Sequence, residues 1–404
     1  MSIEAADTRS PPTQLTLRLK RALGGRAGWS GVAVQIVFVI ALAWIAYEII
    51  VNARANLETQ HIASGFGFLR NTAGFDVSVN LIPYSGSDTY TRVFLVGLFN
   101  TILVSVVGIF FATILGFIVA LGRLSPNWLM ARIAGAYVEI VRNLPLLFQM
   151  LFWYLAVLAV LPAPRQSISP VSGFFLNNRG VIVPTPVPQP GLDYFALAVL
   201  LAIIGSLILR WYARRELYQR GRAIRIWPTM LGLLIGLPLL TVLIFGAPLS
   251  FEWPVLKGFN FIGGSRMVPE FVALTLSLTI YTAAFIAEIV RAGILAVHRG
   301  QMEAGLSLGL SRGRVLRLIV VPQALRVILP PLTNQYLNLT KNSSLAVGIG
   351  YPDLVSVFAG TALSQTGQAI EIIAITMGVY LLLSLITSSI MSFYGWRLGR
   401  SIER

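Results

Sequence analysis

The sequence has no cysteine among its 404 residues, only two histidines and few charged residues. The lack of cysteine excludes disulfides, thiol catalysis and cysteine-ligated metal sites. His61 and His298 are too few and too far apart in the chain to indicate a metal cluster. Charged residues make up 12% of the chain, whereas soluble domains contain roughly 25%. No catalytic, cofactor-binding or metal-binding residue is assigned, and a water-soluble globule is excluded.

Long apolar runs are abundant in the sequence. Apolar residues make up 56% of the chain, and its longest runs can cross a hydrocarbon layer of roughly 30 Å. No barrel-type alternation is present, and lipid favours helices, so we expect an all-α polytopic membrane protein with about eight transmembrane helices. The expected spans are 29–50, 93–121, 133–161, 194–212, 227–245, 271–297, 325–340 and 372–396. The seventh is the least regular, because Pro330 and Pro331 interrupt it.

Basic residues predict the orientation of these spans. Of the 31 Lys and Arg residues, 22 fall in one set of alternate loops and eight in the other, while Arg142 lies within a span. The richer set is expected on the cytoplasmic side, which places both termini inside. The formal net charge of +15 is therefore an orientation signal, and no nucleic-acid partner is expected.

The chain has no loop that could hold the phosphates of a nucleotide. Such a loop ends in Gly-Lys, but Lys20, Lys257 and Lys341 follow leucine, leucine and threonine. ATP-driven transport would therefore need a separate ATPase subunit. The alternative is an ion-coupled secondary transporter or a channel that works without an ATPase, with Glu139 and Glu288 as its intramembrane carboxylates.

The basic loop between the sixth and seventh spans predicts two short helices joined by a sharp turn. Residues 302–308 can form the first helix, which Gly309 can end in a left-handed conformation. Ser311 can cap a second helix that begins at Arg312. Taken alone, this loop could also lie as an amphipathic segment on the membrane surface.

The spacing in this loop resembles a motif of the permease subunits of binding-protein-dependent ABC importers. That motif reads E-A-A, three residues, G, nine residues, I, one residue, L-P, and every interval is matched here. Gly305 replaces the second alanine, and Val321 replaces the leucine. The resemblance implies that loop 298–322 docks on the ATPase, with these coupling residues: Glu303, Ala304, Gly305, Gly309, Ser311, Arg312, Ile319 and Pro322.

Further segments resemble the polar amino-acid subfamily of these permeases. They are residues 139–149, 287–294 and 339–345, and the enlarged layout is similar to one permease of general L-amino-acid importers. The resemblance implies alternating-access uptake of L-amino acids across the bacterial inner membrane. It also implies a periplasmic amino-acid-binding protein, a second and different permease chain, and two ATPase copies that bind ATP and Mg. The chain itself would be neither an enzyme nor a cofactor protein.

The same resemblance divides the chain into a core and additions. The core comprises residues 92–161 and 270–404, and the additions are a cytoplasmic tail (1–28), an N-terminal helix (29–52), a periplasmic loop (53–91) and an insertion with two helices (162–269).

Three groups of polar residues are candidates for the substrate pathway and for a gate. Lys341 with Asn342, Ser343 and Ser344 offers a cation and oxygen acceptors for an amino acid, although an interfacial lysine beside a polar loop would look the same. Pro145 predicts a break in the third span near the pathway. Glu and Arg spaced three apart occur twice and could pair on one helix face, either as ordinary inter-helix pairs or as an inner gate. The remaining candidates are Asn143 and Gln149 for the pathway, and Glu139, Arg142, Glu288 and Arg291 for the gate.

Overall fold

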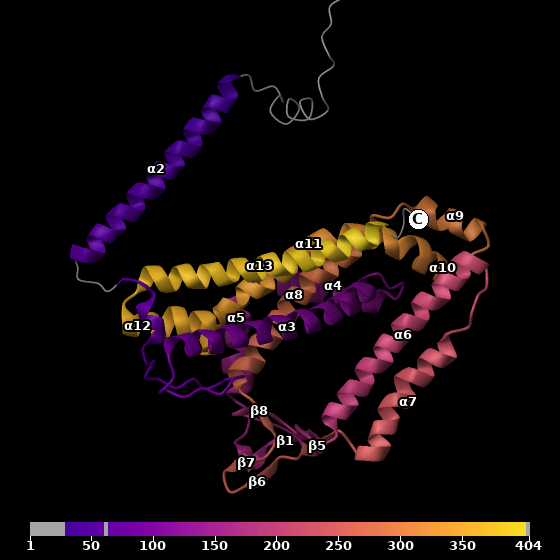
Figure 1. Ribbon diagram of the computed structural model, residues 1–404, viewed down its shortest axis with the longest axis horizontal. Coiled ribbons are helices and arrows are strands. Elements are labelled where there is room, and N and C mark those ends of the chain that lie inside the picture. The colour runs from indigo at the N-terminus through magenta and orange to yellow at the C-terminus, as the bar shows by residue number, and fades with distance from the viewer. Residues whose placement is uncertain (1–28, 60–63, 401–404) are drawn as a thin grey trace, which may run out of the picture. The chain divides into compact units, whose positions relative to one another are not determined.

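A computed structural model describes residues 29–59 and 64–400, which form two units (Figure 1). The expected cytoplasmic tail, 1–28, lies outside the described residues. The first unit contains α2 (Trp29–Thr59), whose apolar window Ala33–Asn52 has a mean hydropathy of 2.3 and is not buried inside the chain. It also contains residues 366–371, where the Glu371 Oε1 atom accepts a hydrogen bond of 2.5 Å from the Gly65 amide.

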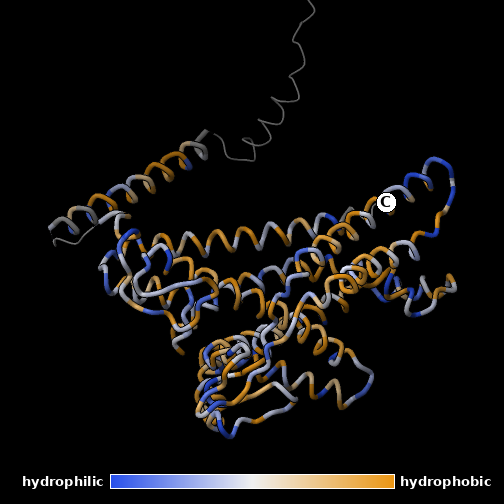
Figure 2. The backbone as a smooth tube through the Cα atoms, turned by 60° about the horizontal axis from the view of Figure 1, so that its bottom comes forward, coloured by the Kyte–Doolittle hydropathy of each residue, from blue (hydrophilic) through white to orange (hydrophobic). Residues whose placement is uncertain are grey.

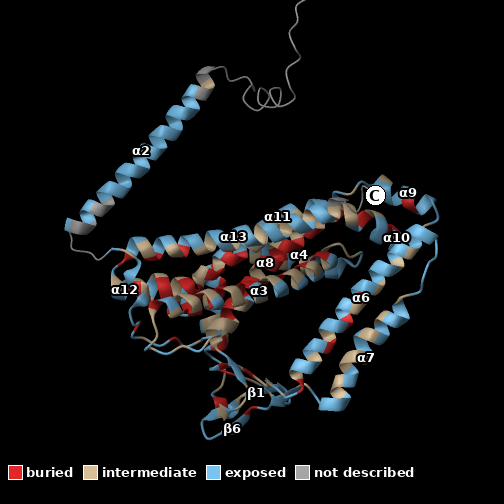
Figure 3. Cartoon of the chain, viewed as in Figure 1, coloured by how far each residue is buried: buried red, intermediate tan, exposed pale blue. Residues whose placement is uncertain are grey.

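Long apolar helices form the centre of the second unit. They are α3 (Tyr90–Arg123), α4 (Trp128–Asn143), α8 (Pro269–Leu295), α11 (Val321–Asn342) and α13 (Ala369–Arg400). The most extensive packing joins α3 to α8, where a Cβ atom added at Gly116 would lie 2.6 Å from Ile286 Cγ2. Small residues at such contacts let helix backbones approach closely in a membrane. Buried residues follow this contact, while the outer faces of the helices are exposed and apolar (Figures 2 and 3).

Shorter helices connect the long ones. They are η1 (Phe66–Arg70), α5 (Leu146–Leu151), η2 (Phe152–Leu158), η3 (Pro164–Gln166), α9 (Arg299–Ser307), α10 (Arg312–Val315), η4 (Leu316–Val320), η5 (Ser343–Ile349), η6 (Val355–Ala362) and α12 (Leu363–Thr366).

The expected helical membrane fold is confirmed, with one difference in the spans. Seven helices of the described residues are long and apolar enough to cross a membrane, or up to eight if one bent pair is counted. That pair is α4 with residues 146–158, which meet at 106°, so the third span is bent at Pro145 as its sequence predicts. The expected interruption of the seventh span is wrong, because α11 is continuous through Pro330 and Pro331.

The insertion contributes a helical hairpin and small β-sheets. The hairpin consists of α6 (Leu192–Arg220) and α7 (Trp227–Phe245), which pack mainly on each other. Near one end, the Tyr194 and Phe245 rings stack with centroids 4.4 Å apart. Short strands before and after the hairpin pair across it, which the sequence did not predict. The strands are β1 (Ile168–Val171), β2 (Phe174–Asn177), β3 (Gly180–Val183), β4 (Thr185–Pro188), β5 (Leu249–Glu252), β6 (Val255–Lys257), β7 (Asn260–Ile262) and β8 (Ser265–Met267).

These strands form a four-stranded antiparallel sheet in the order β1-β2-β3-β8 and two two-stranded pairs, β4-β5 and β6-β7. We call residues 162–191 and 246–268 the β layer. In its register, Ile182 of β3 lies opposite Arg266 of β8. The sheet thus joins the chain before the hairpin to the chain that leads into α8.

Candidate functional site

The loop that carries the sequence motif folds into two short helices joined by a turn, as expected. Helix α9 ends at Ser307, and Gly309 has a φ of +77°, a left-handed conformation that glycine adopts without strain. Its amide donates to the Leu306 carbonyl over 2.9 Å. Ser311 is the extended N-cap residue of α10, although its hydroxyl makes no capping hydrogen bond. The turn is therefore fixed by backbone conformation at Gly309.

One side of this two-helix element is closed by packing. A Cβ atom added at Gly305 would lie 2.8 Å from Ile319 Cδ1 and 2.9 Å from Val315 Cγ2. Val315 is fully buried, and Ile319 is partly buried. Gly305 is therefore placed where α9 meets the helices that follow, which explains why a residue smaller than alanine occupies this position. Pro322 lies in the first turn of α11, so the element continues directly into a long helix.

The other side of the two-helix element is exposed. Glu303, Ala304 and Arg312 are exposed, and Leu308 at the turn is 82% exposed. This leucine adds an exposed apolar side chain to an otherwise charged surface. We call residues 299–320, with Leu308 at their turn, the coupling element, after the role that their sequence motif predicts.

The bend in the third span is closed by a polar side chain. Asn143 ends α4, and Pro145 precedes α5, so carbonyl groups at the bend lack helical partners. The buried Gln149 side chain donates to the carbonyls of Val141 and Leu144, each over 3.0 Å. Gln149 thus stabilises the bend at Pro145. The sequence did not predict this role.

The two Glu-Arg pairs differ. Glu288 and Arg291 form the expected pair on α8, with Arg291 Nη2 2.7 Å from Glu288 Oε1. Arg123 of α3 contacts the other oxygen of Glu288, a partner that the sequence did not predict. Arg142 instead lies over the Phe285 ring, 5.0 Å from its centroid, while Glu139 is exposed. Within residues 29–59 and 64–400, no ion pair is found between Glu139 and Arg142.

Lys341 and Ser344 line a cavity of about 350 Å³ with residues of α13. Lys341 is exposed, at the end of α11 that lies away from the coupling element. Thr376 and Tyr380 add hydroxyl groups to the cavity, and the sequence did not predict either. Ser343 belongs elsewhere, because it is fully buried and donates to the Thr340 carbonyl over 2.8 Å; Asn342 is partly buried.

A buried acid lies behind this cavity. Asp353, in the turn between the spans α11 and α13, has no exposed surface. Its Oδ1 atom accepts from the Ser356 amide over 2.8 Å, and its Oδ2 atom accepts from the Tyr380 hydroxyl over 3.3 Å. Burial raises the pKa of the Asp353 carboxyl to about 7. Asp353 thus orients Tyr380, which lines the cavity. The sequence did not predict this role, because a single aspartate before a helix gives no signal for it.

Comparison with known proteins gives consistent matches. The family described as "Binding-protein-dependent transport system inner membrane component" matches residues 112–398. YhdX of Escherichia coli, provisionally named an amino-acid ABC transporter permease protein, is 52% identical over 90% of this chain and 93% of its own length. AapQ of Rhizobium johnstonii, a general L-amino acid transport system permease protein, is 48% identical over 90% of this chain and 91% of its own.

BztB of Rhodobacter capsulatus, a glutamate/glutamine/aspartate/asparagine transport system permease protein, is 40% identical over 90% of this chain and 91% of its own length. Among solved structures, a chain from a crystal structure of an amino acid ABC transporter with histidines matches with a TM-score of 0.45 and 23% identity. That match covers 76% of this chain and 95% of the other.

Proposed function

Because this chain belongs to the family of binding-protein-dependent transport system inner membrane components, we propose that it moves L-amino acids into the cytoplasm as the permease subunit of an ABC importer. It works by alternating access and performs no covalent chemistry itself. The names of YhdX, AapQ and BztB, which match this chain over 90% of its length, support amino acids as the substrate class. Family membership also favours this function over an ion-coupled carrier or a channel.

The coupling element carries the proposal. Its inner side is packed through Gly305, while Glu303 and Leu308 face outward. We propose that this exposed side docks on a separate ATPase, which binds ATP and Mg. A rigid element that runs directly into α11 can pass a rigid-body movement of the ATPase to the membrane helices.

The proposed assembly contains two ATPase copies, a second and different permease chain, and a periplasmic amino-acid-binding protein. We place it in the bacterial inner membrane with both termini in the cytoplasm, because the loops rich in Lys and Arg then face inward. The translocating part is the five-helix core, 92–161 and 270–404. The tail (1–28), the N-terminal helix (29–52), the outer loop (53–91) and the insertion (162–269) are additions to it.

The cavity beside Lys341 is the proposed outer part of the substrate pathway. The Lys341 ammonium group can hold a substrate carboxylate, and the hydroxyl groups of Ser344, Thr376 and Tyr380 can accept from a substrate ammonium group. Asn342 and Ser343 lie between Lys341 and Ser344 in the sequence but are not among the residues that line this cavity. Asn143, Pro145 and Gln149 then form a bend along the pathway, which can pivot as the helices move.

The charged group on α3, α4 and α8 is the proposed inner gate. Arg123 and Arg291 share the Glu288 carboxylate, and Arg142 reaches the same helix through Phe285. Glu139 is exposed and can take a new arginine partner when the helices rock. Exchange of partners would then accompany each transport cycle.

Reconstitution tests this function directly. The chain is co-expressed with its permease partner and ATPase, reconstituted in proteoliposomes and supplied with its binding protein. Uptake of labelled L-amino acids should require both ATP and the binding protein. Uptake that a proton gradient drives in the absence of the ATPase would overturn the proposal and support the ion-coupled carrier.

A further inference from the structure

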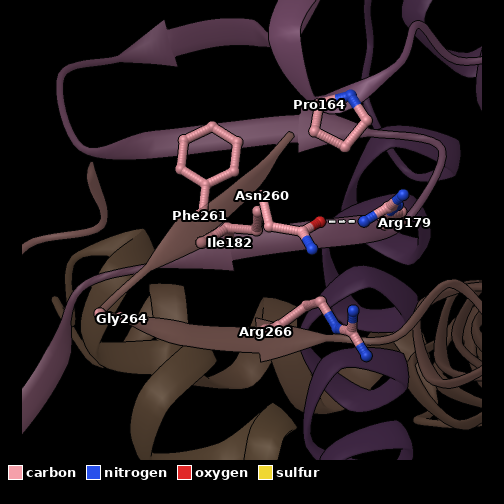
Figure 4. A pocket seen from close by; sticks show the side chains of 8 residues that line it. Pro164, Arg179, Ile182, Asn260, Phe261, Gly264 and Arg266 are labelled. Carbon is pink, nitrogen blue, oxygen red and sulfur yellow. Dashed lines mark hydrogen bonds between the residues drawn. The ribbon is translucent and has the colours of Figure 1, made fainter. Parts of the chain in front are cut away.

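The β layer contains a cavity that shares no lining residue with the cavity beside Lys341. Its volume is about 290 Å³, and it lies between η3, the β2–β3 turn, β7 and β8. Pro164, Ile182 and Phe261 supply apolar walls, while Arg179, Asn260 and Arg266 supply polar groups (Figure 4). In Figure 4 the two guanidinium groups lie toward the same end of the cavity. The cavity therefore offers two cations and one amide beside apolar walls.

The two arginines differ in how they are held. Arg179 donates to the Asn260 Oδ1 atom and is thereby oriented (Figure 4). Arg266 is exposed and, within the part of the chain that the structure describes, makes no hydrogen bond or ion pair with another side chain. It projects from β8 opposite Ile182. The cavity thus holds one oriented guanidinium and one that is free to bind an anion.

The backbone beneath these arginines is closely packed. Gly180, next to Arg179, has a φ of +115°, and a Cβ atom added there would lie 2.0 Å from the Met267 carbonyl oxygen. Only glycine permits this approach between β3 and β8. A site held by such a close backbone contact is organised before a ligand arrives.

The β layer as a whole is positively charged, like the two arginines of the cavity. It contains Arg165, Arg179, Lys257 and Arg266, against a single acidic residue, Glu252. Arg165 is already engaged, because its guanidinium lies 3.9 Å from the Phe259 ring centroid. The Glu252 carboxylate lies near Gly263 and pairs with neither arginine of the cavity within the described ranges. An acidic surface would be attracted to this layer.

The lining fits a carboxylate on a protein better than a free amino acid. A free amino acid also brings an ammonium group, which needs an acceptor, but the lining side chains include no carboxylate. Among the described lining residues, the side-chain amide of Asn260 already accepts from Arg179 through its oxygen. An Asp or Glu side chain carries no such ammonium group, and its stem can rest on Ile182 and Phe261.

We propose that the β layer is a docking surface for an acidic face of the periplasmic binding protein, and that the Arg179–Arg266 cavity receives one of its carboxylate side chains. This inference rests on the proposed function, which puts the β layer on the outer side of the membrane. It gives the insertion a role in recognition, separate from the translocating core.

The test is the affinity of the intact transporter for its binding protein. The complete complex in nanodiscs is titrated with labelled binding protein, with wild-type chain, Arg266→Glu and Arg266→Lys. Arg266→Glu should weaken binding about tenfold or more, because two carboxylates then face each other, and Arg266→Lys should weaken it less. The difference from wild type should shrink when salt rises from about 0.05 M to about 0.5 M, because salt screens the charges.

Arg70→Glu is the matched control, since it reverses an exposed charge of η1 on the same proposed side but outside the β layer. It should leave the affinity near that of wild type. Equal affinity of wild type and Arg266→Glu, or an equal loss in Arg70→Glu, would overturn the docking surface. Binding of labelled glutamate to the complex without binding protein, abolished by Arg266→Glu, would also overturn it and assign the cavity to free amino acids.

The wild-type complex separates this inference from the function on which it rests. If wild type takes up amino acids with ATP and binding protein and Arg266→Glu does so at the same binding-protein concentrations, only the docking surface is wrong. If wild type shows no uptake that depends on ATP and binding protein, the proposed function fails, and the docking surface fails with it.

Discussion

Leu308 at the turn of the coupling element gives the sharpest test of docking. It is 82% exposed, so nearly all of its side chain is still available to be buried by a partner. Replacement by alanine removes three carbon atoms, and at about 0.8 kcal/mol for each buried methylene the loss is roughly 2 kcal/mol. That corresponds to an affinity for the ATPase about 30-fold weaker.

The assay titrates the reconstituted permease pair with labelled ATPase, for wild type and Leu308→Ala. Leu243→Ala serves as the control, because Leu243 is 73% exposed on α7, within the hairpin of the insertion. Leu243→Ala should bind the ATPase like wild type. An unchanged affinity in Leu308→Ala would refute the assignment of this surface to docking and would favour a loop that rests on lipid.

Three further predictions concern the turn, the cavity and the buried acid. Gly309→Ala should place a side chain at φ +77° at a cost of about 1 kcal/mol and should reduce ATP-driven uptake. Gly313→Ala in α10, where an added Cβ atom meets nothing within 4 Å, should transport normally. Equal uptake by the two variants would contradict the role of the turn. Lys341→Ala should raise the KM for uptake about 10-fold or more, because a charge-assisted hydrogen bond contributes roughly 1.5–3 kcal/mol. Lys341→Arg should recover part of this loss. A normal KM in Lys341→Ala would show that this cavity is not part of the pathway. Burial raises the pKa of the folded-state Asp353 carboxyl from its ordinary value of 3.8 to about 7, so the folded state retains the proton and its stability should fall as pH rises between these values. When Tm is measured across the same pH range, Asp353→Asn should not show this loss of stability. Identical Tm profiles for wild type and Asp353→Asn would refute the assigned role of Asp353.

The sequence predicted what depends on local patterns. Hydropathy located the spans, and 227–245 coincides with α7 to the residue. Gly309 and Ser311 predicted the turn of the coupling element, because left-handed conformation and N-cap position are properties of single residues. Pro145 predicted the bend in the third span for the same reason.

The features that were missed depend on contacts between distant parts of the chain. Strand β3 pairs with β8 across the helical hairpin, and no local alternation marks strands of three and four residues. Arg123 and Glu288 meet only because α3 packs on α8. Pro330 and Pro331 predicted a break in the seventh span, but the long helix α11 continues past them.

The α6–α7 hairpin has a consequence for how the membrane takes part in this fold. No residue of α7 is buried inside the chain, and the small residues Ala198 and Ala202 of α6 are among the few that α6 buries. Two helices that shield mainly each other leave the rest of their apolar surface to acyl chains, so lipid acts as a third packing partner. Excision of such a cassette opens no cavity among the other helices, whereas detergents that strip annular lipid should loosen the cassette first.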